Sequence, residues 1–200
     1  MADNTPSSDP STRWIETNRG VLRYSELAPL LAERVLRIQE RIETDAYSDL
    51  SLSEDLILRL HRELCEDLFP DLAGKWRLIA VQVGEHLPPP PHLVPLRMRD
   101  FVLNLQARWE EPIQDTALPE LLAFAEGQFL TIHPFPDLNG RVARLWLWEL
   151  LRRLRLPPVG LAPSDPGAVQ RYLAALRQAD QGNLAPLAKV WMSRLAGENS

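Results

Sequence analysis

The chain has 200 residues, a net charge of −5 at pH 7 and a hydrophobic fraction of 45%, which fits a single domain that buries its own core. The acidic balance argues against nucleic acid or an anionic membrane as a partner. With one cysteine, no apolar run of 18 residues and no signal-peptide core, we expect no internal disulfide, no membrane span and a cytoplasmic location.

Residues 1–10 are polar, and we expect a disordered N-terminus there. Ser51 and Glu54 follow the pattern of a capping box, which predicts the start of a helix. Apolar residues then recur at spacings of three and four, as amphipathic helices require. In this part of the chain the periodic residues are Leu56, Leu60, Leu64, Leu68, Met98, Phe101, Val102, Leu105 and Trp109.

The segment from Gly74 to Pro91 departs from this pattern. Val81 and Val83 alternate with other residues and Gly84 ends the run, which predicts a short strand or hairpin. Four prolines, Pro88–Pro91, follow as an extended stretch. The hairpin is either a mere connection or an edge that pairs with an extended peptide.

The second half of the chain is again helical in pattern. A helix should end at about Ile132, because Pro134 disfavours a helical residue 133. Further helices are expected from Asn139 to about Arg155, from Asp165-Pro166 and from about Asn183. The predicted fold is therefore all-α, a helical bundle with one small β-hairpin.

One of these helix starts has the features of an anion site. Asn139 is a strong N-cap residue, and Gly140 lets a ligand approach the backbone. The amides of residues 140–142 then point out of the helix N-terminus, which attracts anions, and Arg141 and Arg144 add two cations. His133 supplies a basic imidazole and Asp137 a carboxylate within the same short segment. Each residue alone is commonly structural, but together they predict a phosphate-handling site.

The same segment resembles the signature of the Fic family, His-Pro-Phe-x-(Asp/Glu)-Gly-Asn-Gly-Arg-x-x-Arg. The matching residues are His133, Pro134, Phe135, Asp137, Asn139, Gly140, Arg141 and Arg144, and Leu138 replaces a glycine. Residues 74–95 are similar to the family's flap hairpin, and residues 172–187 to its closing helices. The resemblance implies a Fic domain over residues 21–200, with a Fic-type helical bundle and one hairpin flap.

The resemblance implies that the chain is a protein adenylyltransferase. Such an enzyme moves AMP from ATP to a Ser, Thr or Tyr hydroxyl of a target protein and uses Mg²⁺ as its cofactor. The implied roles are general base for His133, Mg²⁺ ligand for Asp137, phosphate binding for Asn139, Gly140, Arg141 and Arg144, and target docking for the flap residues Val81 and Val83.

Leu138 leaves two interpretations open. Either its backbone is ordinary and its side chain faces away, or ATP binds weakly or in an altered pose. An altered pose would favour a phosphotransferase or another nucleotidyltransferase on the same fold. A catalytically silent nucleotide-binding module is the remaining alternative.

A second resemblance concerns residues 11–20, which are similar to the inhibitory helix of Fic proteins. Thr12 and Glu16 share one face of such a helix, and the resemblance implies that Glu16 pairs with Arg144 and excludes the γ-phosphate. Self-modification, the oligomeric state and the identity of the target stay open.

Overall fold

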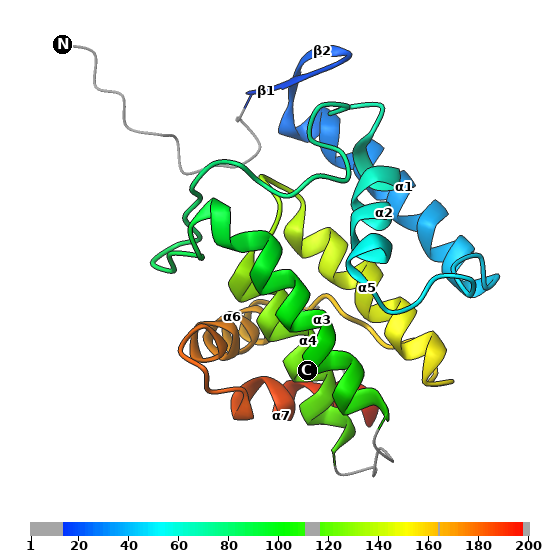
Figure 1. Cartoon of the computed structure of the whole chain (residues 1–200), viewed down its shortest axis with the longest axis vertical. Coiled ribbons are helices and arrows are strands. Elements are labelled where there is room, and N and C mark those ends of the chain that lie inside the picture. The colour runs from blue at the N-terminus through cyan, green and yellow to red at the C-terminus, as the bar shows by residue number, and fades with distance from the viewer. Residues whose placement is uncertain (1–13, 111–116, 164, 198–200) are drawn as a thin grey trace.

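The computed structural model describes residues 14–110, 117–163 and 165–197. Within these ranges the chain forms a bundle of seven α-helices with one two-stranded sheet at its N-terminal end (Figure 1), which confirms the predicted all-α class. The helices are α1 (Tyr24–Glu43), α2 (Glu54–Cys65), α3 (Val94–Glu110), α4 (Leu118–Ile132), α5 (Asn139–Arg153), α6 (Pro166–Asp180) and α7 (Ala185–Leu195). A short 3₁₀-helix at Pro91–Leu93 leads into α3. No helix in the described part of the chain has the length and apolarity needed to cross a bilayer.

Helices α4 and α5 form the centre of the bundle (Figure 1). Helix α4 packs against α3, α6 and α7, helix α5 packs against α1 and α2, and the two pack against each other. Helix α4 is buried on most of its faces, as expected for an element that is surrounded by other helices. The loop of residues 133–138, which joins α4 to α5, is therefore held by helices from both halves of the bundle.

The predicted helix boundaries are mostly confirmed. Helix α4 ends at Ile132, and α6 begins after Asp165, whose side chain accepts hydrogen bonds from the amides of Gly167 and Ala168 at 2.8 and 3.0 Å. The predicted capping box at Ser51 is wrong. Helix α2 is capped by Ser53, because the Ser53 hydroxyl accepts from an amide of the first helical turn.

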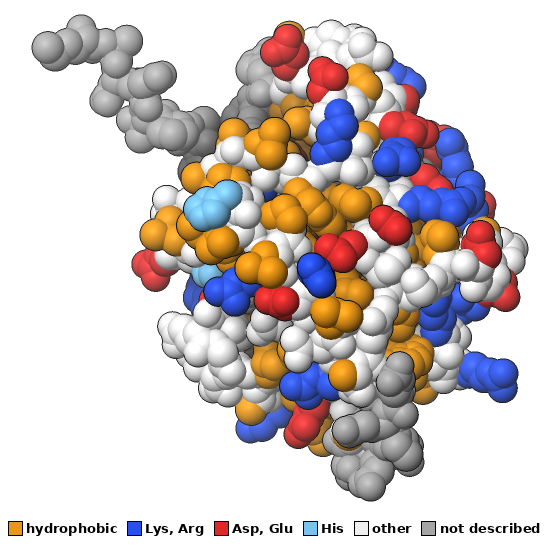
Figure 2. Space-filling view, viewed as in Figure 1, with side chains coloured by type: hydrophobic (Ala, Val, Ile, Leu, Met, Phe, Trp, Pro, Cys, Tyr) orange, Lys and Arg blue, Asp and Glu red, His pale blue; other side chains and the backbone are white. Residues whose placement is uncertain are grey.

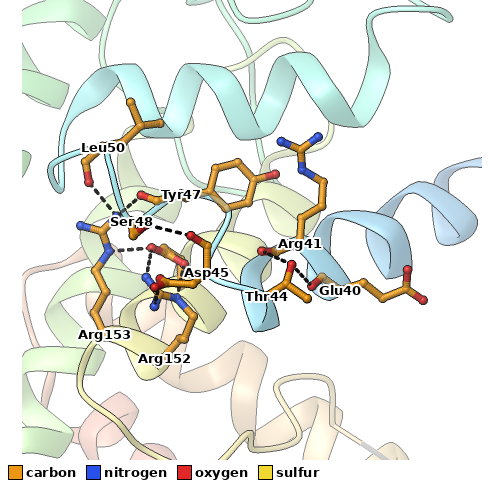
Figure 3. A network of polar contacts seen from close by, with 10 residues as sticks. Glu40, Arg41, Thr44, Asp45, Tyr47, Ser48, Leu50, Arg152 and Arg153 are labelled. Atoms are coloured by element: carbon orange, nitrogen blue, oxygen red, sulfur yellow. Dashed lines mark hydrogen bonds and ion pairs between the residues drawn. The ribbon is translucent and has the colours of Figure 1, made fainter.

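Polar contacts at the end of α5 fix the connection between α1 and α2 (Figure 3). Glu149 has no exposed surface, and both Arg152 and Arg153 donate hydrogen bonds to its carboxylate. Arg153 also donates to the carbonyls of Tyr47 and Leu50, each at 2.8 Å. These bonds compensate a fully buried carboxylate, and they tie the first two helices to the central one.

The N-terminal residues form a hairpin and not the predicted inhibitory helix. Strands β1 (Trp14–Thr17) and β2 (Gly20–Arg23) pair antiparallel. Gly20 has a φ of +99°, and the Thr17 hydroxyl donates to the Gly20 carbonyl at 2.7 Å, so the turn between the strands is incompatible with a helix. The prediction is thus wrong for residues 14–20, whereas Thr12 lies outside the described residues.

The predicted strand in the segment that we call the flap, residues 75–90, is also wrong in part. The flap contains no regular strand, and its only ladder contact is an isolated antiparallel bridge between Val83 and His86 with two N–H···O bonds of 3.0 Å. Gly84, at a φ of +59°, lies in the turn between them. A hairpin turn therefore exists where it was expected, but its two arms are extended without further pairing.

A buried histidine connects α2 to the centre of the fold. His61 is 2% exposed, its Nδ1 accepts the Gly74 amide at 3.0 Å, and its ring stacks on Phe135 with a centroid distance of 3.8 Å. Burial lowers the pKa of His61 to about 4, although a backbone contact with Asp137 opposes the shift.

This burial predicts acid sensitivity of the fold. The folded-state pKa lies below the ordinary 6.5, so the unfolded chain binds the proton first, and stability is lost as pH falls from about 6.5 towards 4. Complete loss of this contribution lowers the free energy of unfolding by about 3 kcal/mol. We expect His61→Asn, whose amide oxygen can accept from Gly74, to flatten the plot of unfolding free energy against pH over this range. Urea titrations would measure it, and the matched control His92→Asn, at an exposed histidine, should keep the original slope.

Candidate active site

The loop between α4 and α5 has an unusual backbone at both ends. His133, the C-cap of α4, has φ 49° and ψ 62°, and Leu138, directly before α5, has φ 67° and ψ 7°. Residues other than glycine rarely adopt this left-handed conformation, because it costs each of them about 1 to 2 kcal/mol of conformational free energy. Such strain persists only where the surrounding structure holds it, and it is frequent at functional sites.

Phe135 and Asn139 hold the loop in this shape. The Asn139 side chain accepts from the Phe135 amide and donates to the Phe135 carbonyl, both at 2.9 Å. The Phe135 ring is fully buried and stacked on His61. The predicted N-cap role of Asn139 is therefore wrong, because its side chain braces the preceding loop and Leu138 occupies the cap position.

Leu138 agrees with neither interpretation completely. Its backbone is left-handed and therefore not ordinary, but its side chain is 6% exposed and belongs to the hydrophobic core. The side chain thus packs inside the protein. The replacement of glycine strains the backbone without adding bulk on the solvent side of the loop.

His133 is half-buried in this loop and its pKa is lowered. Burial is the largest cause, because it disfavours the charged imidazolium. A hydrogen bond to the Leu130 carbonyl opposes this shift, the charges of Arg77 and His86 add to it, and the charge of Asp137 counteracts it. A histidine with a pKa below its ordinary value is neutral at pH 7, and so is able to accept a proton.

The exposed Asp137 has one carboxylate oxygen engaged. Its Oδ1 accepts the Leu138 amide at 2.7 Å, and the other oxygen is available to a ligand. No cluster of three or more acidic, histidine or cysteine side chains exists among the described residues. One carboxylate fits Mg²⁺ that shares its coordination with phosphate oxygens and waters, and does not form a metal site from protein groups alone.

The N-terminus of α5 has free donors. Arg141 and Val142 donate their amides to the Leu138 carbonyl at 2.9 and 3.0 Å, so the expectation that these two would be free is wrong. The amides of Asn139 and Gly140 have no acceptor in the described part of the chain. A Cβ at Gly140 would meet nothing within 4 Å, so there is open space beside Gly140. Unpaired amides at a helix N-terminus are a candidate site for an anion.

The two arginines of the signature differ in their surroundings. Arg144 is half-buried, and among the described residues no carboxylate or other group pairs with its guanidinium. Burial lowers its pKa, which reflects a charge held away from water. Arg141 donates to the Tyr24 hydroxyl at 3.2 Å and lies over the Tyr24 ring. The sequence reasoning missed Tyr24, because no pattern in the sequence links it to Arg141, 117 residues away.

The other predicted site residues lie outside this loop. Glu16 is exposed in β1 and makes no ion pair with Arg144 or with any other described residue, so the structure does not bring the two together. Val83 is 42% exposed at the turn of the flap, and Val81 is half-buried beside it. The assigned roles of His133, Asp137, Arg141 and Arg144 stay predictions.

Comparison with known proteins places the chain in a family. Residues 51–151 match the model of the Fic/DOC family, and the chain belongs to this family. The matched range includes the loop of residues 133–138 and the start of α5. The chain is 32% identical over 139 residues to protein adenylyltransferase Fic of Nematostella vectensis, covering 68% of this chain and 30% of that protein. It is 35% identical over 141 residues to protein adenylyltransferase fic-1 of Caenorhabditis briggsae, covering 69% and 26%.

Solved structures agree with the fold. Fic-1 of C. elegans (residues 134–508) has a TM-score of 0.62 and 26% identity, and the match covers 83% of this chain and 47% of that one. The BepC protein of Bartonella tribocorum, solved with bound AMPPNP, has a TM-score of 0.71 and 16% identity over 92% of both chains. The chain spans between a quarter and a third of the length of the curated relatives and about half of the C. elegans structure.

The strain at Leu138 gives an unusual order of stabilities. Leu138→Ala removes buried side-chain atoms but keeps a Cβ in the left-handed region, with a loss of about 2 to 5 kcal/mol. Leu138→Gly removes the same atoms and also relieves strain of about 1 to 2 kcal/mol. We therefore expect the glycine variant to unfold at higher urea concentration than the alanine variant, the reverse of the usual order. If alanine is the more stable, the left-handed backbone at 138 is not strained in solution.

Proposed function

We propose that the chain is a protein adenylyltransferase domain, which transfers AMP from ATP to a hydroxyl side chain of a target protein. One observation carries the proposal: the strained loop holds a histidine with a lowered pKa before the open N-terminus of α5, and the first turns of α5 hold an arginine, Arg144, that has no partner among the described residues. The curated relatives named protein adenylyltransferase support the same reaction, as does the AMPPNP bound to the similar BepC fold.

In the proposed reaction His133 is the general base. The hydroxyl oxygen of the target attacks the α-phosphorus of ATP while its proton passes to the neutral imidazole. The bond between the α-phosphorus and the bridging oxygen breaks, and pyrophosphate leaves. The left-handed backbone and the buried Phe135 fix the direction in which the imidazole points.

The remaining residues bind the nucleotide. The amides of Asn139 and Gly140 donate to phosphate oxygens, with Arg141 as a second donor and Arg144 for the γ-phosphate. The Asn139 side chain takes no part, because Phe135 uses both of its polar atoms. Asp137 would hold Mg²⁺, which supplies charge neutralisation at the phosphates.

The flap is the proposed docking surface for the target. Its exposed apolar side chains are Leu78, Ile79, Val83 and Leu87, and hydrophobic side chains gather on the same side of the molecule in Figure 2. The extended arms on either side of the Val83–His86 bridge form no further ladder bonds among the described residues. Such a segment suits an extended peptide that adds as a strand, with Val81 and Val83 beside it.

The position of Leu138 bears on the alternatives. A leucine that obstructed the phosphate path would favour a phosphotransferase or a silent module. Its side chain is buried in the core, so this reason for an altered nucleotide pose is removed. The adenylyl transfer is therefore favoured.

Two labels distinguish these reactions. Incubation with Mg²⁺ and either α-³²P-ATP or γ-³²P-ATP, with cell protein as the target mixture, should leave label on protein only from the α-labelled nucleotide. Label from the γ-position alone would identify a phosphotransferase. ATP binding in calorimetry without either label on protein would identify a silent module, and both of these results contradict the proposal.

Removal of the base tests the role of His133. We expect His133→Ala to reduce α-label transfer by about 10²- to 10⁴-fold, the usual contribution of a general base. ATP affinity, measured by calorimetry, should change little because the phosphate donors belong to α5. The exposed His92→Ala serves as the matched control and should transfer label normally. Equal rates for the two variants would exclude His133 as the base.

Autoinhibition by Glu16 is the remaining proposal. Glu16 lies on a hairpin that is anchored to the turn after α2, where the Asn18 amide donates to the Leu68 carbonyl at 2.8 Å. Pairing with Arg144 therefore requires the hairpin to rearrange. If it does so in solution, Glu16→Gly increases α-label on protein and Glu16→Gly with Arg144→Ala does not, since both changes act through one residue. Unchanged labelling in Glu16→Gly would mean that this segment is no inhibitor.

A further inference from the structure

A third arginine, outside the signature, contacts the backbone at the start of the loop that carries His133. Arg77 is 1% exposed and is one of the largest fully buried side chains in the described structure. Its Nε donates to the carbonyl of His133 at 2.8 Å and its Nη2 to the carbonyl of Ile132 at 3.3 Å. Its backbone amide donates to the carbonyl of Pro134 at 2.9 Å. Arg77 therefore binds three consecutive carbonyls, those of the last helical residue, the proposed base and the residue after it.

The same guanidinium binds both ends of the flap. Its Nη1 donates to the carbonyl of Ile79 at 3.0 Å, and its Nη2 also donates to the carbonyl of Pro89 at 2.6 Å. These residues lie on either side of the Val83–His86 turn. One side chain thus joins the two arms of the flap to each other and to the loop that carries His133.

The chemistry of this contact explains why an arginine is needed. A buried guanidinium is stable only if its N–H groups have hydrogen-bond acceptors. The Arg77 side chain has four acceptors, and all of them are backbone carbonyls. No carboxylate pairs with Arg77 in the described part of the chain, so its positive charge is not cancelled. The planar fork reaches several acceptors at once, whereas a lysine ammonium is a compact point charge on a flexible stem.

The uncancelled charge also acts on the imidazole. Burial is the largest cause of the lowered pKa of His133, and the charges of Arg77 and His86 lower it further, while the Leu130 carbonyl and the charge of Asp137 raise it. His86 belongs to the flap as well, and its Nε2 lies 2.8 Å from the Thr131 carbonyl and 3.7 Å from the Asp180 carboxylate. The charged or titratable groups that act on His133 are thus Arg77 and His86 of the flap and the Asp137 carboxylate of its own loop.

From these contacts we propose that Arg77 is a positioning residue, which holds the proposed base in its left-handed conformation and fixes the target-docking flap relative to it. The proposal rests on the proposed function in one respect, since it takes His133 as the base. Its consequence is that the distance between a peptide on the flap and the imidazole is set by one buried side chain and not by the flap's own weak pairing.

Two variants and a matched control test this role without any transfer reaction. Arg77→Met removes the charge and the donors, Arg77→Lys keeps the charge but loses the fork, and Arg97→Met changes an exposed arginine. Amide hydrogen exchange of Val83 and His86, the two amides that are hydrogen-bonded across the turn of the flap, should become at least tenfold faster in Arg77→Met and Arg77→Lys, and stay unchanged in Arg97→Met. Exchange of the α5 amides serves as an internal reference for the intact fold.

The titration of His133, followed by NMR with ring-labelled histidine, separates positioning from mere stability. We expect the His133 pKa to rise in Arg77→Met and to stay closer to the original value in Arg77→Lys. Flap exchange and His133 titration that are both unchanged in a folded Arg77→Met would overturn the proposal. If Arg77→Met does not fold, Arg77→Lys decides, and unchanged flap exchange in that variant overturns it. Because neither readout needs ATP, failure here is distinct from failure of the labelling experiments.

Discussion

The stacking of Phe135 on His61, together with the two hydrogen bonds between Phe135 and Asn139, is the contact on which the site depends. It joins α2 to the loop and to the start of α5, which are distant from α2 in the sequence but meet it at the centre of the bundle. Removing the ring would leave a cavity and free the loop ends. The positions of His133 before the ring, and of the open amides after it, both follow from this anchor.

Backbone strain in the loop opposes the stabilisation that this contact provides. His133 and Leu138 each take a left-handed backbone, at a cost of about 1 to 2 kcal/mol apiece. Burial of the Phe135 ring and of the Leu138 side chain offsets this cost, because each places apolar surface in the core. The loop can thus change direction sharply between two packed helices and still expose the N-terminus of α5 to a ligand.

The arginines that pair with buried carboxylates differ in their surroundings from the arginine that we propose binds the γ-phosphate. Arg153 and Arg194 each pair with a buried glutamate, Glu149 and Glu126. Arg77 has only carbonyl acceptors, and Arg144 has no partner among the described residues. A half-buried guanidinium without a counter-charge is unfavourable in the free protein, and an anionic ligand would relieve it. The absence of a partner for Arg144 among the described residues, and not the number of positive charges, supports the proposed anion site.

The sequence alone determined the features that depend on local chemistry. Pro134 ended α4 at Ile132, Asp165 with Pro166 began α6, and the signature residues identified the loop. Only the tertiary structure decided the features that depend on contacts between distant residues. In the folded chain the Asn139 side chain bonds to Phe135 and does not cap α5, and the Leu138 side chain is buried. Tyr24 contacts Arg141, and Arg77 bonds to residues 132–134. The physical reason is that helix signals act over a few residues, whereas burial and hydrogen-bond partners are set by elements that approach one another only after folding.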